Sequence, residues 1–133
     1  MADVTIASAP RAVPFTDGMV TFEHYINGNE STGVKKEWIV PFNGHIVDVI
    51  VDVETAPSGS TSIVDIHKNG TTIYTTQGNR PTIPADDTGL YAEAGEPEIT
   101  SLRYGDVLLA EIDQIGSGTA ATRMKILIIC QRH

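Results

Sequence analysis

The amino-acid sequence predicts an all-β fold, an antiparallel β-sandwich of jelly-roll-like type, and three observations lead to this prediction. Asn69-Gly70 stands between two β-branched runs and suits a two-residue type I′ turn, because both central residues of that turn need a positive φ. Apolar residues recur with a period of two in about eight short runs, separated by turn residues at the spacing typical of sandwiches. No segment carries the sustained three- and four-residue apolar spacing of an amphipathic helix.

The turn at Asn69-Gly70 also sets the register of the hairpin around it. Three cross-strand pairs are expected: Lys68 with Thr71, Ile66 with Ile73, and Val64 with Thr75. Ile66, Ile73 and Val64 then share an apolar face, while Asp65, His67 and Tyr74 share the other face.

The runs that precede the hairpin are predicted strands with one apolar face each. In the first, Val20, Phe22 and Ile26 alternate with polar neighbours. In the second, the residues expected on the apolar face are Val34, Trp38, Val40 and Phe42. In the next, they are Val47, Val49, Val51 and Val53. Further strand-like runs are expected over residues 98–103, 107–115 and 123–131.

The chain of 133 residues has the length of one domain preceded by an arm. Residues 1–17 are polar and interrupted by Pro10 and Pro14, so we interpret them as an extended N-terminal arm. Residues 18–133 form the predicted β-sandwich domain.

A long connection, residues 77–97, is rich in glycine, proline and acidic residues. Connections of this length inside a compact domain often bind something, and Arg80 and Tyr91 are the candidate ligand-facing residues. The alternative is an ordinary crossover loop that Ile83 and Leu90 fix to the core.

Composition argues against several classes of protein. The formal net charge is −8 and the nine basic residues are scattered, which argues against a nucleic-acid surface. No apolar run approaches the length of a membrane helix. The N-terminus carries no secretory signal pattern, so we expect synthesis in a cytoplasm. The single cysteine, Cys130, ends an apolar run and is interpreted as a buried small hydrophobe rather than a reactive thiol.

Motifs for catalysis or metal binding are not apparent. The chain has no GxSxG, HExxH or P-loop pattern, so we expect no enzyme and no cofactor. Asp65 and His67 are two apart on one strand, a common structural pairing. Asp48 and Asp52 share a face, but no calcium-loop pattern accompanies them, so no metal site is expected.

The last strand-like run has apolar side chains on both faces, namely Ile126, Leu127, Ile128 and Ile129. A strand of this kind is covered on both sides, and in a small sandwich the second cover is often another subunit. We therefore expect these residues at a subunit interface or in the core that supports it.

The order of motifs from Pro41 to Ile129 resembles a β-sandwich domain of tailed-phage virion proteins. The matching segments are Pro41–Ser60, the hairpin Val64–Ile73, the RPTI loop Arg80–Ile83, the GDVLLAEIDQIGS segment Gly105–Ser117, and the strand Met124–Ile129. The resemblance implies a capsid decoration (cement) protein, a head fibre, or the tip of a tail fibre or baseplate, often homotrimeric.

The expected function is therefore that of a non-enzymatic virion structural protein, a capsid decoration or cement protein. Its partners would be two further copies of itself and the major capsid protein, and its location the capsid surface of the virion. The arm residues Val4, Ile6, Val13 and Phe15 are candidates for capsid contact, unless the arm is the first strand of its own domain. The alternative function is a tip domain that recognises a carbohydrate.

Overall fold

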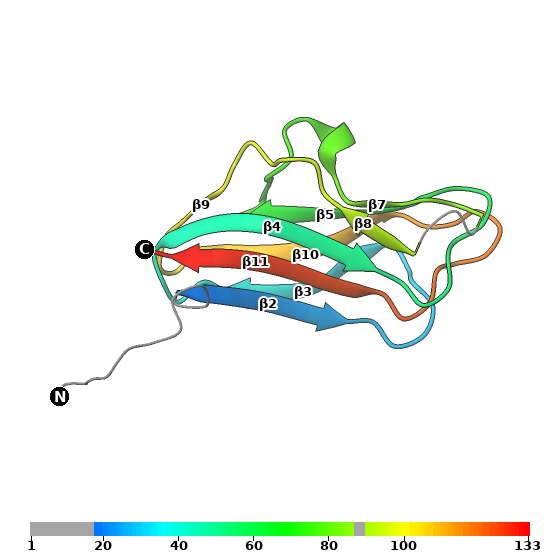
Figure 1. Ribbon diagram of the computed structural model, residues 1–133, viewed down its shortest axis with the longest axis horizontal. Helices are drawn as coiled ribbons and strands as arrows, with labels where there is room; N and C mark the ends of the chain where they lie inside the picture. The colour runs from blue at the N-terminus through cyan, green and yellow to red at the C-terminus, as the bar shows by residue number, and fades with distance from the viewer. Residues whose placement is uncertain (1–17, 87–89) are drawn as a thin grey trace.

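The computed structural model describes residues 18–86 and 90–133, which form two antiparallel sheets packed face to face (Figure 1). The β4 sheet has the strand order β2 (Met19–Tyr25), β11 (Lys125–Arg132), β4 (Gly44–Asp52), β8 (Tyr91–Glu93), with β9 (Ser101–Leu102) also paired to β4. The β5 sheet has the order β3 (Gly33–Ile39), β10 (Val107–Gln114), β5 (Ser62–Lys68), β6 (Thr71–Thr72), with β7 (Thr82–Ile83) also paired to β5. A short 3₁₀ helix, η2, spans Gln77–Asn79.

The predicted all-β sandwich is confirmed. The predicted arm, with Val4, Ile6, Val13 and Phe15, lies outside the described residues.

The core lies between the two sheets and is built from alternate residues of the long strands. On the central strands the completely or almost completely buried residues are Ile126, Ile128 and Cys130 of β11 and Leu108, Ala110 and Ile112 of β10. At the β2 and β3 side, the ring of Phe22 lies 5.9 Å from Trp38 and 6.1 Å from Phe42, which fills the space between the sheets. Burial of these apolar side chains is the main stabilising term of the fold.

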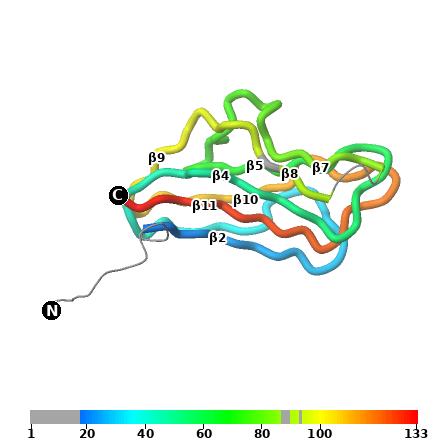
Figure 2. Tube along the Cα trace, in the orientation of Figure 1, coloured from blue at the N-terminus to red at the C-terminus, as the bar shows by residue number. Residues whose placement is uncertain are grey.

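The opposite side of the sandwich is closed by two connecting segments that run close together, between β6 and β7 and between β8 and β9 (Figure 2). Ile73 and Tyr74 are fully buried there. The carbonyl of Ile73 accepts hydrogen bonds from the backbone N–H groups of Glu98 and Ile99. The long connection is therefore packed against the core through part of its length, with Ile83 fully buried and Leu90 43% exposed.

The hairpin has the predicted turn but a shorter pairing than predicted. Asn69 and Gly70 have φ angles of 52° and 86°, as a type I′ turn needs. Lys68 pairs with Thr71, and the N–H of Ile73 donates to the carbonyl of Ile66. The predicted pairing of Val64 with Thr75 is wrong, because β6 ends at Thr72 and the N–H of Val64 donates to the Pro81 carbonyl instead.

The apolar face predicted for β4 is wrong at one position. The register places Asp48 opposite Ile129 and Ile46 opposite Cys130, so Val47 is an extra residue in a β-bulge. The bulge reverses the alternation: Ile46 is buried, whereas Val47 is 51% exposed. Val49 and Val51 lie in the core as predicted.

A second bulge explains the misplacement of Val34. Glu111 pairs with Val34 and Ala110 with Lys36, which leaves Lys35 as the extra residue. Val34 is consequently 54% exposed instead of sharing the core face of β3.

A buried carboxylate, that of Glu30, connects three separate parts of the chain. Its Oε2 atom accepts hydrogen bonds from Ser62 Oγ at 2.7 Å, from the Ala121 N–H at 2.8 Å and from the Gly116 N–H at 3.3 Å. Glu30 is only 4% exposed, so these donors have little access to water. The interaction holds the β2–β3 connection against the start of β5 and the β10–β11 connection.

We expect Glu30→Ala to lower the free energy of unfolding by about 2–4 kcal/mol, because three donors would lose a charged acceptor in a buried site. Glu54→Ala is the matched control, since that side chain is 65% exposed and should change stability by less than about 0.5 kcal/mol. Chemical denaturation of both variants measures the difference. Equal stability of the two variants would contradict the role assigned to Glu30.

We expect Gly70→Ala to destabilise the protein by about 1 kcal/mol. A Cβ at Gly70 would meet no atom within 4 Å, so the cost comes from the positive φ alone. Gly78→Ala is the control, because a Cβ there also meets nothing within 4 Å but the backbone has no positive φ. Thermal melts that show no difference between the two variants would refute the conformational argument.

Candidate functional site

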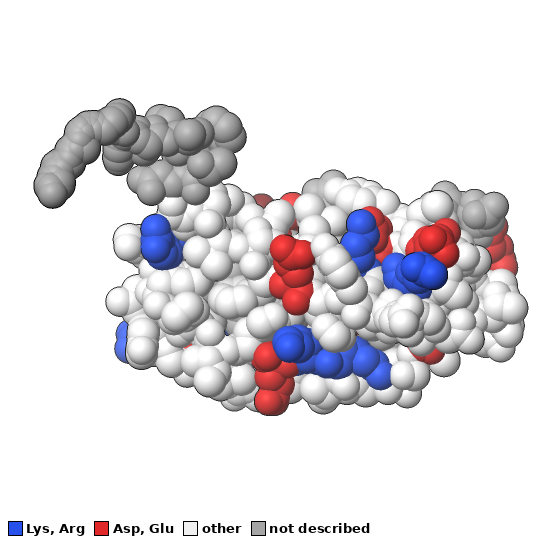
Figure 3. Space-filling view, turned by 90° about the horizontal axis from the view of Figure 1, so that it is seen from below, with Lys and Arg blue, Asp and Glu red and all other residues white. Residues whose placement is uncertain are grey.

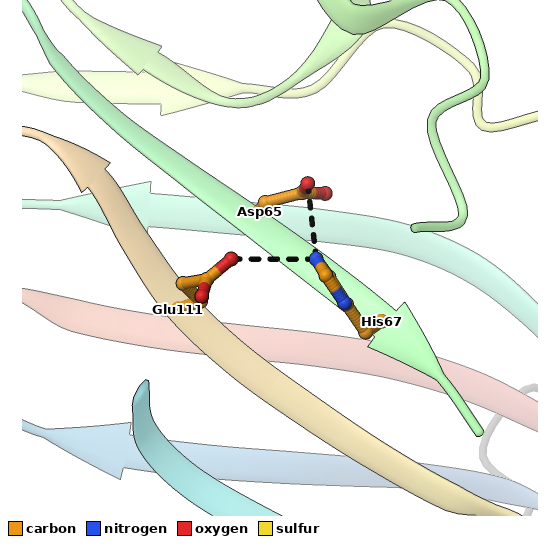
Figure 4. Close-up of side chains that lie close together, drawn as sticks. All are labelled: Asp65, His67 and Glu111. Atoms are coloured by element: carbon orange, nitrogen blue, oxygen red, sulfur yellow. Dashed lines mark ion pairs between the residues drawn. The ribbon is translucent and has the colours of Figure 1, made fainter. Parts of the chain in front are cut away.

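Three side chains that can bind a metal or exchange a proton meet on the outer face of the β5 sheet (Figure 4). The register places Glu111 of β10 directly opposite Asp65 of β5, with His67 two residues further along β5. The Nε2 atom of His67 lies 3.3 Å from Asp65 Oδ2 and also 3.3 Å from Glu111 Oε1. One ring nitrogen therefore faces two carboxylates.

The Asp65 carboxylate is held in place by the strand and its neighbour. Its Oδ1 atom accepts hydrogen bonds from the Ile66 N–H at 2.8 Å and from Thr72 Oγ1 at 2.7 Å. The side chain is only 4% exposed, whereas those of His67 and Glu111 are 24% and 28% exposed. The buried Asp65 carboxylate is thus fixed at the bottom of the cluster, while the His67 and Glu111 side chains are partly open to solvent.

Further charges surround this cluster. Arg80, predicted to face a ligand, forms an ion pair with Asp113 at 2.6 Å, and its Nε donates to the Gln77 carbonyl. Burial and the adjacent Asp113 carboxylate raise the pKa of Glu111. A raised carboxylate pKa is expected where negative groups gather out of water.

The residues predicted for a subunit interface or its supporting core lie on the two faces of β11. Ile126 and Ile128 are fully buried in the core, while Leu127 and Ile129 lie on the outer face of the β4 sheet and are half-buried. There Leu127 is paired with Ile50 and Ile129 with Asp48, and the exposed Val47 of the bulge precedes Asp48 in β4. We call Val47, Ile50, Leu127 and Ile129 the apolar stripe.

A row of polar and aromatic side chains crosses the same outer face near one end. Lys125 pairs with Tyr25 on one side and with Asp52 on the other, and Asp52 pairs with Tyr91. Tyr25 and Tyr91 are 61% and 53% exposed, and an ion pair of 3.5 Å joins Lys125 to Asp52 between them. We call these four residues the tyrosine row. A shallow groove adjoins it, lined by Tyr25, Asn27, Asp52, Glu54, Arg123 and Lys125.

Cys130 is fully buried, as the sequence predicted, and burial raises the pKa of its thiol to about 12. A thiol with this pKa is not a nucleophile near neutral pH.

The side of the molecule formed by β2 and β3 shows charges of both signs interspersed with uncharged surface (Figure 3). Near the tyrosine row, Lys125 forms an ion pair with Asp52 and Arg123 forms one with Glu54, so positive and negative charges lie side by side there as well.

Comparison of the chain with protein-family models, with curated proteins and with solved structures gave no match. Within residues 18–86 and 90–133, no helix is long and apolar enough to cross a membrane.

Sequence reasoning missed Glu111 as a partner of Asp65 and His67. The three residues are brought together by the pairing of β10 with β5, strands separated by more than 35 residues of chain. The available signal was the alternation of Glu111 with the core residues Ala110 and Ile112, which places the carboxylate on the outer face.

Proposed function

We propose that this chain is a non-enzymatic structural protein of a phage virion, a capsid decoration or cement protein that acts as a homotrimer. The observation that favours this function is the apolar stripe on the outer face of the β4 sheet. The resemblance of Pro41–Ile129 to phage virion domains supplies the biological setting.

The stripe has the composition of a contact surface. Its four aliphatic residues lie on the neighbouring strands β11 and β4, and the polar positions beside them include Asp48 of β4 and the exposed Thr21 and Glu23 of β2. Covering such a surface with a second subunit contributes about 25 cal/mol for each Å² of apolar area removed from water. A polar border around an apolar centre is the usual arrangement of a protein–protein interface.

In this function the protein adds contact area to an assembled shell. Each trimer would bridge neighbouring copies of the major capsid protein, and the arm of residues 1–17 would extend to the shell. An extended arm can add a strand to the edge of a neighbouring sheet, which gains backbone hydrogen bonds without a deep pocket.

We expect a trimer in native mass spectrometry at micromolar concentration, and decoration over the whole shell when particles lacking the protein are incubated with it and imaged by electron microscopy. The double variant Leu127→Lys, Ile129→Lys should lose both the trimer and the decoration, because it places charges in the stripe.

Val34→Lys is the control, since Val34 is also apolar and exposed but lies in the other sheet. A monomeric wild-type protein would contradict the trimer. Trimers that bind only at the tail would instead favour a fibre or baseplate position.

A second candidate function is carbohydrate recognition, which the tyrosine row favours. Two exposed aromatic rings flank a Lys–Asp ion pair, so stacking surfaces and hydrogen-bonding groups lie on one face. Three strand spacings separate Tyr25 from Tyr91, or about 14 Å along the sheet. Planar groups with this separation suit an extended ligand rather than a small molecule in a pocket.

If the chain binds a carbohydrate through this row, Tyr25→Ala and Tyr91→Ala should each weaken binding to the best ligand on a glycan array by about tenfold. Tyr104→Ala is the control, because Tyr104 is 76% exposed and lies in the turn before β10. The absence of any glycan hit, or equal effects of all three variants, would exclude this function.

A further inference from the structure

We propose that Asp65, His67 and Glu111 bind one divalent transition-metal ion, with Zn²⁺ the best match to their donor atoms. Within residues 18–86 and 90–133, they are the only group of three His, Cys, Asp or Glu side chains whose ligand atoms lie within 4.8 Å of one another. The proposal does not depend on the proposed virion function.

The distances fit a shared metal ion. Zinc binds histidine nitrogen and carboxylate oxygen at about 2.0–2.2 Å, so two ligands of a tetrahedral ion are about 3.3–3.6 Å apart. Both separations from His67 Nε2, to Asp65 Oδ2 and to Glu111 Oε1, are 3.3 Å. All three ligand atoms lie within 4.8 Å of one another, so rotation of the partly exposed side chains, without movement of the strands, would bring them onto one ion.

A single hydrogen bond from His67 cannot serve both of the carboxylate oxygens that face its ring nitrogen. His67 Nε2 carries at most one proton, yet it faces two carboxylate oxygens at the same distance. A metal ion at their centre would bond to the nitrogen and to both oxygens.

The local charge also favours a dication. The carboxylates of Asp65, Glu111 and Asp113 lie together, and the guanidinium of Arg80 is committed to Asp113. With a neutral imidazole the group carries three negative charges and one positive charge, so a divalent ion would bring it to zero. A mixed set of imidazole and carboxylate ligands selects zinc and its neighbours over calcium or magnesium.

The carboxylate at the base is already positioned for binding. Because the Ile66 N–H and the Thr72 hydroxyl both bind Asp65 Oδ1, the Oδ2 atom is the one directed at His67. The partial exposure of His67 and Glu111 gives the ion a path from solvent and leaves coordination positions for water. The bound ion would join β5 to β10 and, through Thr72, to β6.

The test is calorimetric titration of the tag-free, full-length protein with Zn²⁺. We expect one ion per chain and a higher melting temperature when Zn²⁺ is present. His67→Ala and Glu111→Gln should each weaken binding by at least about tenfold and abolish the shift in melting temperature. Both side chains are partly exposed, so these variants should still fold.

His45→Ala is the matched control. His45 and His133 bring two imidazole nitrogens to 2.8 Å from each other, and among the described residues no carboxylate joins them in a group of three. Binding that is absent, that survives His67→Ala or Glu111→Gln, or that is lost in His45→Ala would overturn the proposal. If His67→Ala fails to fold, the imidazole ¹⁵N signals of the wild-type protein decide: the His67 signals must shift as one equivalent of Zn²⁺ is added.

Discussion

Alternation of side chains along β11 and along residues 107–112 of β10, the central strands of the two sheets, is the constraint on which both the core and the outer surfaces depend. Ile126, Ile128 and Cys130 point into the core, so Leu127 and Ile129 must lie on the outer face of the β4 sheet. In β10 the same rule buries Leu108, Ala110 and Ile112 and leaves Glu111 outside, opposite Asp65. The apolar stripe and the Asp65–His67–Glu111 cluster are thus consequences of core packing.

β-Bulges interrupt the alternation of side chains beside the apolar stripe and beside the Asp65–His67–Glu111 cluster. The bulge at Val47 turns an aliphatic side chain outward and enlarges the apolar stripe. A further bulge in β10 makes Asp113 an extra residue next to the cluster, where it forms the ion pair with Arg80. Bulges commonly redirect a side chain at a functional surface, and each costs part of the hydrogen-bonding ladder. Glu30 acts on the connections instead: its carboxylate accepts hydrogen bonds from the start of β5 and, twice, from the β10–β11 connection.

The fold could be predicted from the sequence where the signal was local. The turn at Asn69-Gly70 and the shared apolar face of Val49 and Val51 depend on neighbouring residues, and both were predicted correctly. Val34 and Val47 were misplaced because a bulge depends on the partner strand, which the sequence does not display. The cluster was missed for the same reason: Asp65 and His67 are close in sequence, but Glu111 joins them only through the register of β10 against β5.

The apolar stripe and the Asp65–His67–Glu111 cluster lie on opposite outer faces of the sandwich, so binding at each would stabilise a different sheet. A subunit that covers the stripe would contact the β4 sheet, and an ion bound by the cluster would join strands of the β5 sheet. Neither event needs the other face, since the core lies between them. An ion that joins β5, β6 and β10 would stiffen the side that the subunit leaves uncovered, because β6 is only two residues long and is otherwise held by few ladder bonds. A neighbouring subunit would then stabilise the β4 sheet, and a bound metal ion would stabilise the β5 sheet.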